Sequence, residues 1–150
     1  ESRYRVLIVD TISEQLFRTN KPMKTKKQLL AVVELGGYPD FSSIYESMGF
    51  EVTTESSVRN AIRSFKNLKP EVVVAEFNFQ SDFRDRTSSL ESLLSTMQWL
   101  EKCEIVIFFE KEYEHQLEKL KVQYTLHATL PFPIEEDSLR QALHELNPLE

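Results

Sequence analysis

The stretch Pro70-Glu71-Val72-Val73-Val74-Ala75-Glu76-Phe77-Asn78-Phe79 decides the fold. Pro70 breaks the helical pattern before it, and the apolar residues that follow do not alternate with polar ones. A short continuous apolar run between breakers is typical of a strand buried on both faces, as in the middle of a parallel sheet. The run stops at Glu76. Because ligand and catalytic groups gather at the carboxyl ends of strands in open α/β sheets, Glu76 is the first candidate functional residue.

Four further segments are predicted as strands around this one, over residues 5–10, 50–54, 104–109 and 125–130. Helical patterns with apolar residues on one side separate them, over residues 41–48, from 57 to about 65, over 88–101 and over 112–124, and a last helix starts near residue 135. Strands and helices thus alternate five times. This order predicts a parallel sheet that is covered by helices on both faces.

The segment from residue 11 to about residue 40 is harder to assign. Its residues 28–35 fit a short helix closed by Gly36-Gly37. Five basic residues without an acid precede or open this helix: Arg18, Lys21, Lys24, Lys26 and Lys27. They would suit an acidic partner, a phosphate-bearing ligand or nucleic acid. We prefer a solvated loop that balances an acidic domain, because the aromatic residues typical of single-strand binding are not interleaved with them.

Composition bounds the class of protein. The chain has 150 residues, 41% hydrophobic and 28% charged, as in an ordinary globular domain. A net charge of −6 argues against broad nucleic-acid binding. The one cysteine, Cys103, excludes an internal disulfide and favours a reducing, cytoplasmic location. Because the sequence does not begin with Met, we interpret it as a single domain, residues 1–150, excised from a larger protein.

Several pieces of sequence together carry a family resemblance. They are Val6-Leu7-Ile8-Val9-Asp10, Gly49-Phe50-Glu51-Val52, Pro70-Glu71-Val72-Val73-Val74-Ala75-Glu76 and Phe132-Pro133-Ile134-Glu135-Glu136-Asp137-Ser138-Leu139. Their order and spacing resemble the receiver domain of two-component response regulators over nearly the whole chain. The resemblance implies a doubly wound, flavodoxin-like (βα)5 fold with a five-stranded parallel sheet. Here the receiver would carry an insertion after the first strand, at about residues 11–40.

The resemblance also implies a phosphorylation site that this chain has lost. A working receiver has an acceptor Asp after the third strand, acids after the first strand that hold Mg²⁺, a hydroxyl after the fourth strand and a Lys after the fifth. In this sequence the corresponding degenerate site consists of Asp10, Thr11, Glu76, Phe109 and Phe132, with Phe108 and Leu130 as the alternatives in a shifted register. Without the second acid, the hydroxyl and the Lys, most of the electrostatic stabilisation of phosphoryl transfer is gone.

We therefore expect a pseudo-receiver, a signalling module without catalytic activity that acts through protein–protein contacts. No cofactor and no metal site is predicted, since two carboxylates are few for Mg²⁺ and the histidines lack metal-ligand spacing. Two alternatives remain. The first is an atypical phosphoacceptor or Mg²⁺-binding receiver. The second is a domain that binds a nucleotide or nucleic acid through the basic segment.

The role of Glu76 has two interpretations. As a fixed carboxylate it would hold the domain in an active-like state; as an ordinary strand-end acid it would be solvated or hydrogen-bonded locally, which we favour. Aromatic residues near the same edge either fill the former active site as a small core, which we favour, or leave an apolar pocket. They are Phe77, Phe79, Phe83, Phe108, Phe109 and Phe132.

The expected partners are proteins. They are a fused output domain or a separate protein, and a second copy bound through the last two helices and the last strand. A membrane partner is not expected, since no apolar run approaches the length of a membrane span.

Overall fold

The computed structural model describes residues 26–78 and 89–148. Its strands are β1 (Lys27–Val32), β2 (Phe50–Glu55), β3 (Val72–Glu76), β4 (Glu104–Phe109) and β5 (Ala128–Pro131). Its helices are α2 (Ser42–Ser47), α3 (Val58–Leu68), α4 (Ser89–Met97), the 3₁₀ turn η1 (Lys111–Tyr113), α5 (Glu114–Gln123) and α6 (Glu136–Leu146). None of the helices in these ranges has the length and apolar character to cross a membrane.

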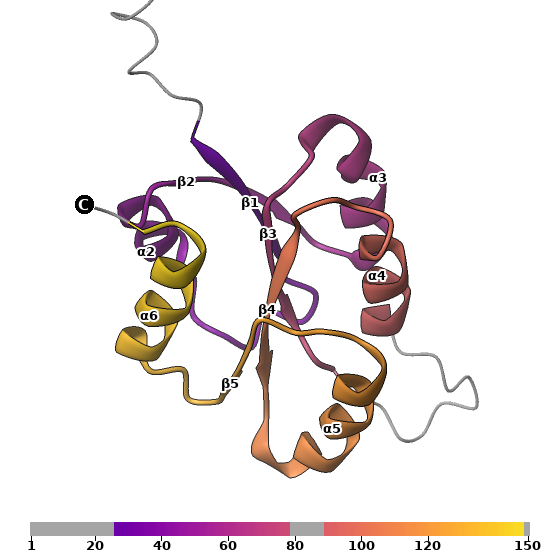
Figure 1. The fold of residues 1–150 in the computed structure, drawn as a ribbon. Helices are drawn as coiled ribbons and strands as arrows, with labels where there is room; N and C mark the ends of the chain where they lie inside the picture. Colours follow the sequence, from indigo (N-terminus) through magenta and orange to yellow (C-terminus); the bar gives the residue numbers. More distant parts are fainter. Residues whose placement is uncertain (1–25, 79–88, 149–150) are drawn as a thin grey trace, which may run out of the picture.

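The five strands form one parallel sheet in the order β2-β1-β3-β4-β5 (Figure 1). The predicted five-stranded parallel sheet is therefore confirmed. Strand β3 lies in the centre, and all five of its residues are buried, as its continuous apolar sequence predicts. Its last residue, Glu76, lies beside Phe108 of β4. The carboxyl ends of β1, β3 and β4 thus meet at one edge of the sheet.

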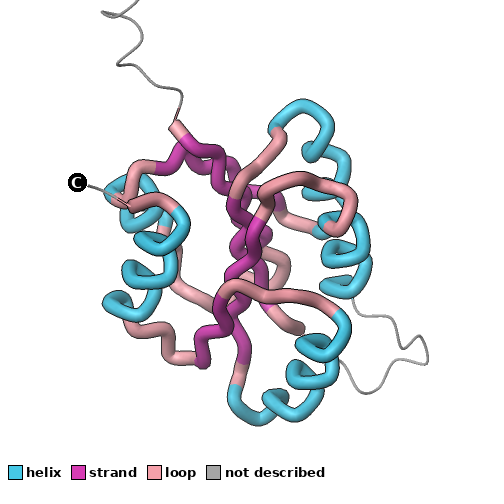
Figure 2. Tube along the Cα trace, in the orientation of Figure 1, coloured by secondary structure: helices cyan, strands magenta, loops and turns pink. Residues whose placement is uncertain are grey.

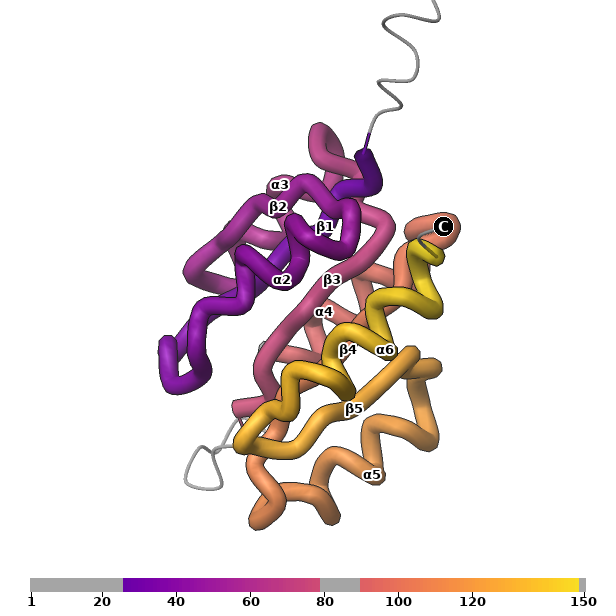
Figure 3. Tube along the Cα trace, turned by 90° about the vertical axis from the view of Figure 1, so that its left-hand side faces the viewer, coloured from indigo at the N-terminus to yellow at the C-terminus, as the bar shows by residue number. Residues whose placement is uncertain are grey.

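Helices cover both faces of the sheet (Figure 2). We call the side of α3, α4 and α5 the closed face, and the side of α2 and α6 the pocket face (Figures 1 and 3). Successive strand side chains point to opposite faces. Val73 accordingly packs in the closed-face core with residues of α3, α4 and α5, whereas Val74 packs on the pocket face with residues of α2 and α6.

The pocket face is covered by one long helix, α6 with 11 residues, and one short helix, α2. On the closed face, α3 has 11 residues, and the Ser57 hydroxyl accepts a hydrogen bond from the Asn60 N–H at its start. On the pocket face, α2 has only 6 residues, a span of about 9 Å at a rise of about 1.5 Å per residue. The irregular segment 33–41 leads from β1 into α2. Loop backbone and a short helix therefore cover one end of the pocket face.

The first strand differs from the prediction. Residues 28–35 were expected to form a short helix, but Lys27–Val32 is the strand β1, which pairs with both β2 and β3. Strand β1 therefore has the position between β2 and β3 that was expected for residues 5–10. Residues 5–10 lie outside the described ranges. The segment expected as an insertion, about residues 11–40, thus contains β1, the first strand of the described residues. Leu29-Leu30-Ala31-Val32 is a short apolar run whose periodicity fits either a buried helix or a buried strand, so pairing decided the outcome.

Candidate functional site

Glu76 is a buried carboxylate at the carboxyl edge of the sheet. Only 6% of its surface is exposed. Among the described residues, Glu76 is the one polar or charged residue that is buried. Its Oε1 accepts hydrogen bonds from the Leu35 backbone N–H at 3.3 Å and from Asn78 Nδ2 at 3.4 Å. Both distances are long for such bonds. Glu76 is therefore bonded locally, to the loop that follows β1 and to its own strand end.

Aromatic rings pack beside this carboxylate. Tyr38, from the loop after β1, has its ring centroid 5.4 Å from that of Phe108 and 5.5 Å from that of Phe132. Phe41 meets Phe108 edge to face at 5.6 Å. Such separations are typical of favourable aromatic pairs. The rings join the loop after β1 to the ends of β4 and β5, so they hold that loop over the sheet edge.

Two tyrosines at the site remain protonated over the physiological pH range. The pKa of Tyr38 is raised to about 12, mainly by burial, and the nearby charges of Glu110 and Glu76 contribute to this rise. Burial is also the largest cause of the raised pKa of Tyr45, followed by the charges of Asp40 and Glu76. Both hydroxyls are therefore available as hydrogen-bond donors next to carboxylates.

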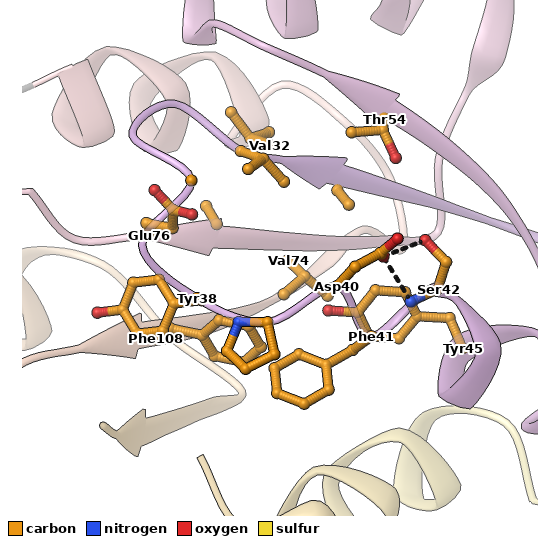
Figure 4. A pocket seen from close by; sticks show the side chains of 15 residues that line it. Val32, Tyr38, Asp40, Phe41, Ser42, Tyr45, Thr54, Val74, Glu76 and Phe108 are labelled. Carbon is orange, nitrogen blue, oxygen red and sulfur yellow. Dashed lines mark hydrogen bonds between the residues drawn. The ribbon is translucent and has the colours of Figure 1, made fainter. Parts of the chain in front are cut away.

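A pocket of about 330 Å³ opens between the loop after β1 and the pocket face (Figure 4). Its walls come from the ends of β1, β3 and β4, from Thr54 on β2 and from the start of α2. Figure 4 shows Glu76 at one end of the pocket and Asp40 and Thr54 toward the other. The Asp40 carboxylate accepts hydrogen bonds from the Ser42 N–H and hydroxyl at 2.9 and 2.7 Å, so it anchors the start of α2.

The structure separates the residues of the predicted degenerate site. Asp10 and Thr11 lie outside the described residues. Phe109 is buried in the closed-face core, away from the pocket, whereas Phe108 packs on the pocket face and lines the pocket. Phe132 is 43% exposed and covers Tyr38. Phe108, the alternative to Phe109 in a shifted register, pairs with Glu76 across the two strands.

The other aromatic candidates divide in the same way. Phe77 is buried in the closed-face core. Phe79 and Phe83 lie outside the described residues. The rings near Glu76 fill part of the sheet edge and also leave a pocket, so the two outcomes weighed from the sequence occur together.

Sequence reasoning missed two residues of this edge. Tyr38 was placed in a supposed insertion, although it contacts both Phe108 and Phe132. The receiver resemblance implies an acid after the first strand, and the sequence analysis assigns Asp10 to this position. In the structure, Glu34 is the acid that follows β1. The signal was present: Val32-Val33-Glu34 repeats the pattern of Val74-Ala75-Glu76, an apolar run that ends in a glutamate.

The basic segment is described only at its end. Lys26 is exposed, and the Lys27 Nζ donates a hydrogen bond to the Leu146 carbonyl at the end of α6, at 2.8 Å. A cation at that position also interacts favourably with the helix dipole. Arg18, Lys21 and Lys24 lie outside the described residues. The basic surface therefore stays a prediction, and Lys27 has a structural contact inside the domain.

The magnesium ion that a receiver-like site implies needs several oxygen ligands in near-octahedral geometry. Within residues 26–78 and 89–148, no group of three or more His, Cys, Asp or Glu side chains is placed to hold a metal ion. Glu76 and Asp40 lie toward opposite ends of the pocket, so they supply at most one carboxylate to an ion at either end. The donors of the described chain therefore do not fit this ion.

The free cysteine offers no nucleophile. Burial raises the pKa of the Cys103 thiol to about 12, with smaller contributions from the charges of Glu104 and Glu71. The thiolate is the reactive form, so at neutral pH this side chain behaves as a small apolar group.

Comparison with known proteins places the fold. No family model and no curated protein matches the sequence significantly. Among solved structures, a response regulator receiver domain protein from Clostridium thermocellum is similar with a TM-score of 0.63 at 17% identity, over 80% of this chain and 93% of that one.

Two further structures are similar. A chemotaxis response regulator of Vibrio cholerae matches with a TM-score of 0.58 at 19% identity, over 81% of this chain and 99% of that one. The receiver domain of a sensor histidine kinase from Pseudomonas aeruginosa, solved with a magnesium ion coordinated in its active-site cleft, matches with a TM-score of 0.59 at 13% identity, over 83% and 100%. The resemblance inferred from the sequence is thus confirmed at the level of the fold, which is that of response-regulator receiver domains.

Proposed function

We propose that this chain is a receiver-type signalling domain that is not phosphorylated and that acts through protein–protein contacts. The receiver fold supports a role in two-component signalling. The observation that carries the rest is the surrounding of Glu76, which is buried, bonded to the Leu35 N–H and flanked by Phe108. The domain would be non-enzymatic and would work in the cytoplasm.

Phosphoryl transfer needs charge stabilisation that the described residues do not supply. The transferred group carries negative charge on its equatorial oxygens, and metal ions and cationic side chains normally neutralise it. Among residues 26–78 and 89–148, Glu76 is bonded to an amide and a side-chain amide, and no lysine or arginine lines its pocket. In either register the residues are apolar where a hydroxyl and a cation would be needed: Phe109 with Phe132, or Phe108 with Leu130.

The test is intact-mass measurement after incubation with acetyl phosphate and Mg²⁺, with a phosphorylatable receiver domain as positive control. We expect no mass gain for the wild-type chain. We also expect none for Glu76→Asp, which restores the acceptor type but not the missing cation. A gain of one phosphoryl group that disappears in Glu76→Gln would contradict the proposal. A gain only in Glu76→Asp would show that acceptor length, rather than the missing cation, blocks the reaction.

The output of the domain would pass through contact with a fused output domain or with a second copy. We place the homodimer contact on α5, β5 and α6. Strand β5 is at the edge of the sheet and pairs only with β4 among the described strands. His127 lies 3.0 Å from Glu145 and ties the approach to β5 to α6, which gives this face a defined shape. Sedimentation equilibrium tests this part: a mass of one chain at high concentration would contradict it.

A further inference from the structure

The pocket beside Glu76 has apolar and aromatic walls. The side chains of Val74 and Phe108, which pack on the pocket face, line it on the sheet side, and Phe41 and Tyr45 close it toward α2. Its volume of about 330 Å³ lies at the lower end of the range of small-molecule sites, about 300–1,000 Å³. The pocket therefore suits a compact molecule with an apolar body.

The polar groups of the pocket favour a cation. Glu76 and Asp40 both line it, and no Lys, Arg or His is among its lining residues. The two hydrogen bonds to Glu76 Oε1 are long, at 3.3 and 3.4 Å. A buried carboxylate with such weak partners is costly unless a further donor or a positive charge reaches it.

We propose that this pocket binds a small organic amine, whose ammonium group pairs with the Glu76 carboxylate and whose apolar body packs against Phe108 and Val74. Aromatic faces attract cations, so Tyr38 and Phe108 stabilise the same charge that Glu76 neutralises. Tyr38 and Tyr45 also line the pocket, and their hydroxyls stay protonated, so they add no further negative charge. Anions are disfavoured because both carboxylates repel them and no cation in the lining compensates.

Binding at Glu76 would also act on the loop after β1. The Leu35 N–H is bonded to the same carboxylate that receives the ammonium group. The loop contains Gly36 in the left-handed region, with φ of 70°, which a residue with a side chain adopts only with strain. An amine at Glu76 thus changes the hydrogen bond that holds the loop over the sheet edge. Amine binding would then be a signal to which the domain responds without phosphorylation.

The experiment is a titration of the isotope-labelled protein, followed by amide chemical shifts, with three probes of the same shape. Phenethylamine carries a positive charge at neutral pH, phenethyl alcohol is neutral and phenylacetate is negative. We expect saturable shifts at Leu35, Gly36 and Glu76 with phenethylamine, and affinity about tenfold higher than for phenethyl alcohol, as one charge-assisted hydrogen bond provides. Phenylacetate should bind most weakly.

Two variants test whether the preference for the amine depends on the Glu76 carboxylate. Glu76→Gln keeps the size of the side chain and an oxygen that accepts from the Leu35 N–H, but it removes the charge, so the preference for the amine over the alcohol should disappear. Glu118→Gln, an exposed acid on α5, is the matched control and should keep it. The dispersion of the amide spectrum verifies that both variants are folded.

Three results would overturn the proposal. They are no saturable shift with phenethylamine, equal affinity for the amine and the alcohol, and an unchanged preference in Glu76→Gln. The titration measures binding without a phosphodonor, so its outcome is independent of whether the domain is phosphorylated.

Discussion

The two faces of the sheet are built from the same strands but are filled differently. On the closed face, three helices of 9 to 11 residues bury a continuous apolar core. On the pocket face, the six-residue helix α2 leaves part of the sheet to the loop after β1, and a pocket of about 330 Å³ remains. The difference teaches that the pocket forms beside the short helix α2, whereas α6, on the same face, has 11 residues.

The closed face should be the more sensitive to truncation. Leu93 of α4 is fully buried there. Leu93→Ala leaves a cavity among residues held by three helices, so we expect a loss of about 3 kcal/mol in the free energy of unfolding. Urea denaturation measures it. Val122→Ala, at an exposed position of α5, should change stability by less than about 0.5 kcal/mol. Similar losses in both variants would show that the closed face is not tightly packed.

Neighbouring valines of β3 compare the faces directly. Val73 points to the closed face and Val74 to the pocket. Val73→Ala should cost about 2 kcal/mol, through two lost methyl groups and a new cavity. Val74→Ala should cost about 1 kcal/mol, because its side chain already borders empty space. Chemical denaturation of the pair checks the order, and a larger loss for Val74→Ala would reverse the comparison.

The helix starts also differ between the faces. On the closed face, Ser57→Ala removes the acceptor of the Asn60 N–H and should cost about 1 kcal/mol. Ser64→Ala, in the middle of the same helix, is the control: its hydroxyl bonds to the Ala61 carbonyl of its own helix, and alanine favours helix, so stability should change little. Thermal unfolding resolves the two. Equal losses would mean that the cap does not stabilise α3.

The start of α2 should give the smallest effect, visible only as a pH dependence. Hydrogen bonds from the Ser42 side chain and backbone lower the pKa of Asp40. Since the folded-state pKa is below the unfolded one, this contribution is present above about pH 4 and is lost as the pH falls further. In Asp40→Asn, the free energy of unfolding should fall less steeply as the pH decreases below about 4. Near pH 7 its dependence on pH should be the same as in the wild type. An identical acid limb in both proteins would contradict this assignment.

The sequence predicted the regions where pattern and pairing agree. The apolar runs that form β3 and β4 favour a strand over a helix, because Pro70 bounds one and both are rich in β-branched residues. The local pattern of residues 28–32 does not favour a strand in the same way. Their run fits a helix or a strand, and only pairing with β2 and β3, which is a long-range property, makes them β1.

The site was predictable only in part. Glu76 follows from its place at the end of a buried strand. The choice between Phe108 and Phe109 depends on register and alternation, which the strand pairing provides. Tyr38 was not predictable, because it comes from an irregular loop whose course depends on the positive φ of Gly36 and on packing against Phe108.

The central claim is that the edge of the sheet keeps the receiver shape without the ionic machinery of phosphoryl transfer. The most direct measurement is a titration of the isotope-labelled chain with millimolar Mg²⁺, followed at the amides of Glu34, Leu35, Glu76 and Asn78. We predict no saturable shift at these positions. Saturable shifts there that vanish in Glu76→Gln would show a working metal site and contradict the claim.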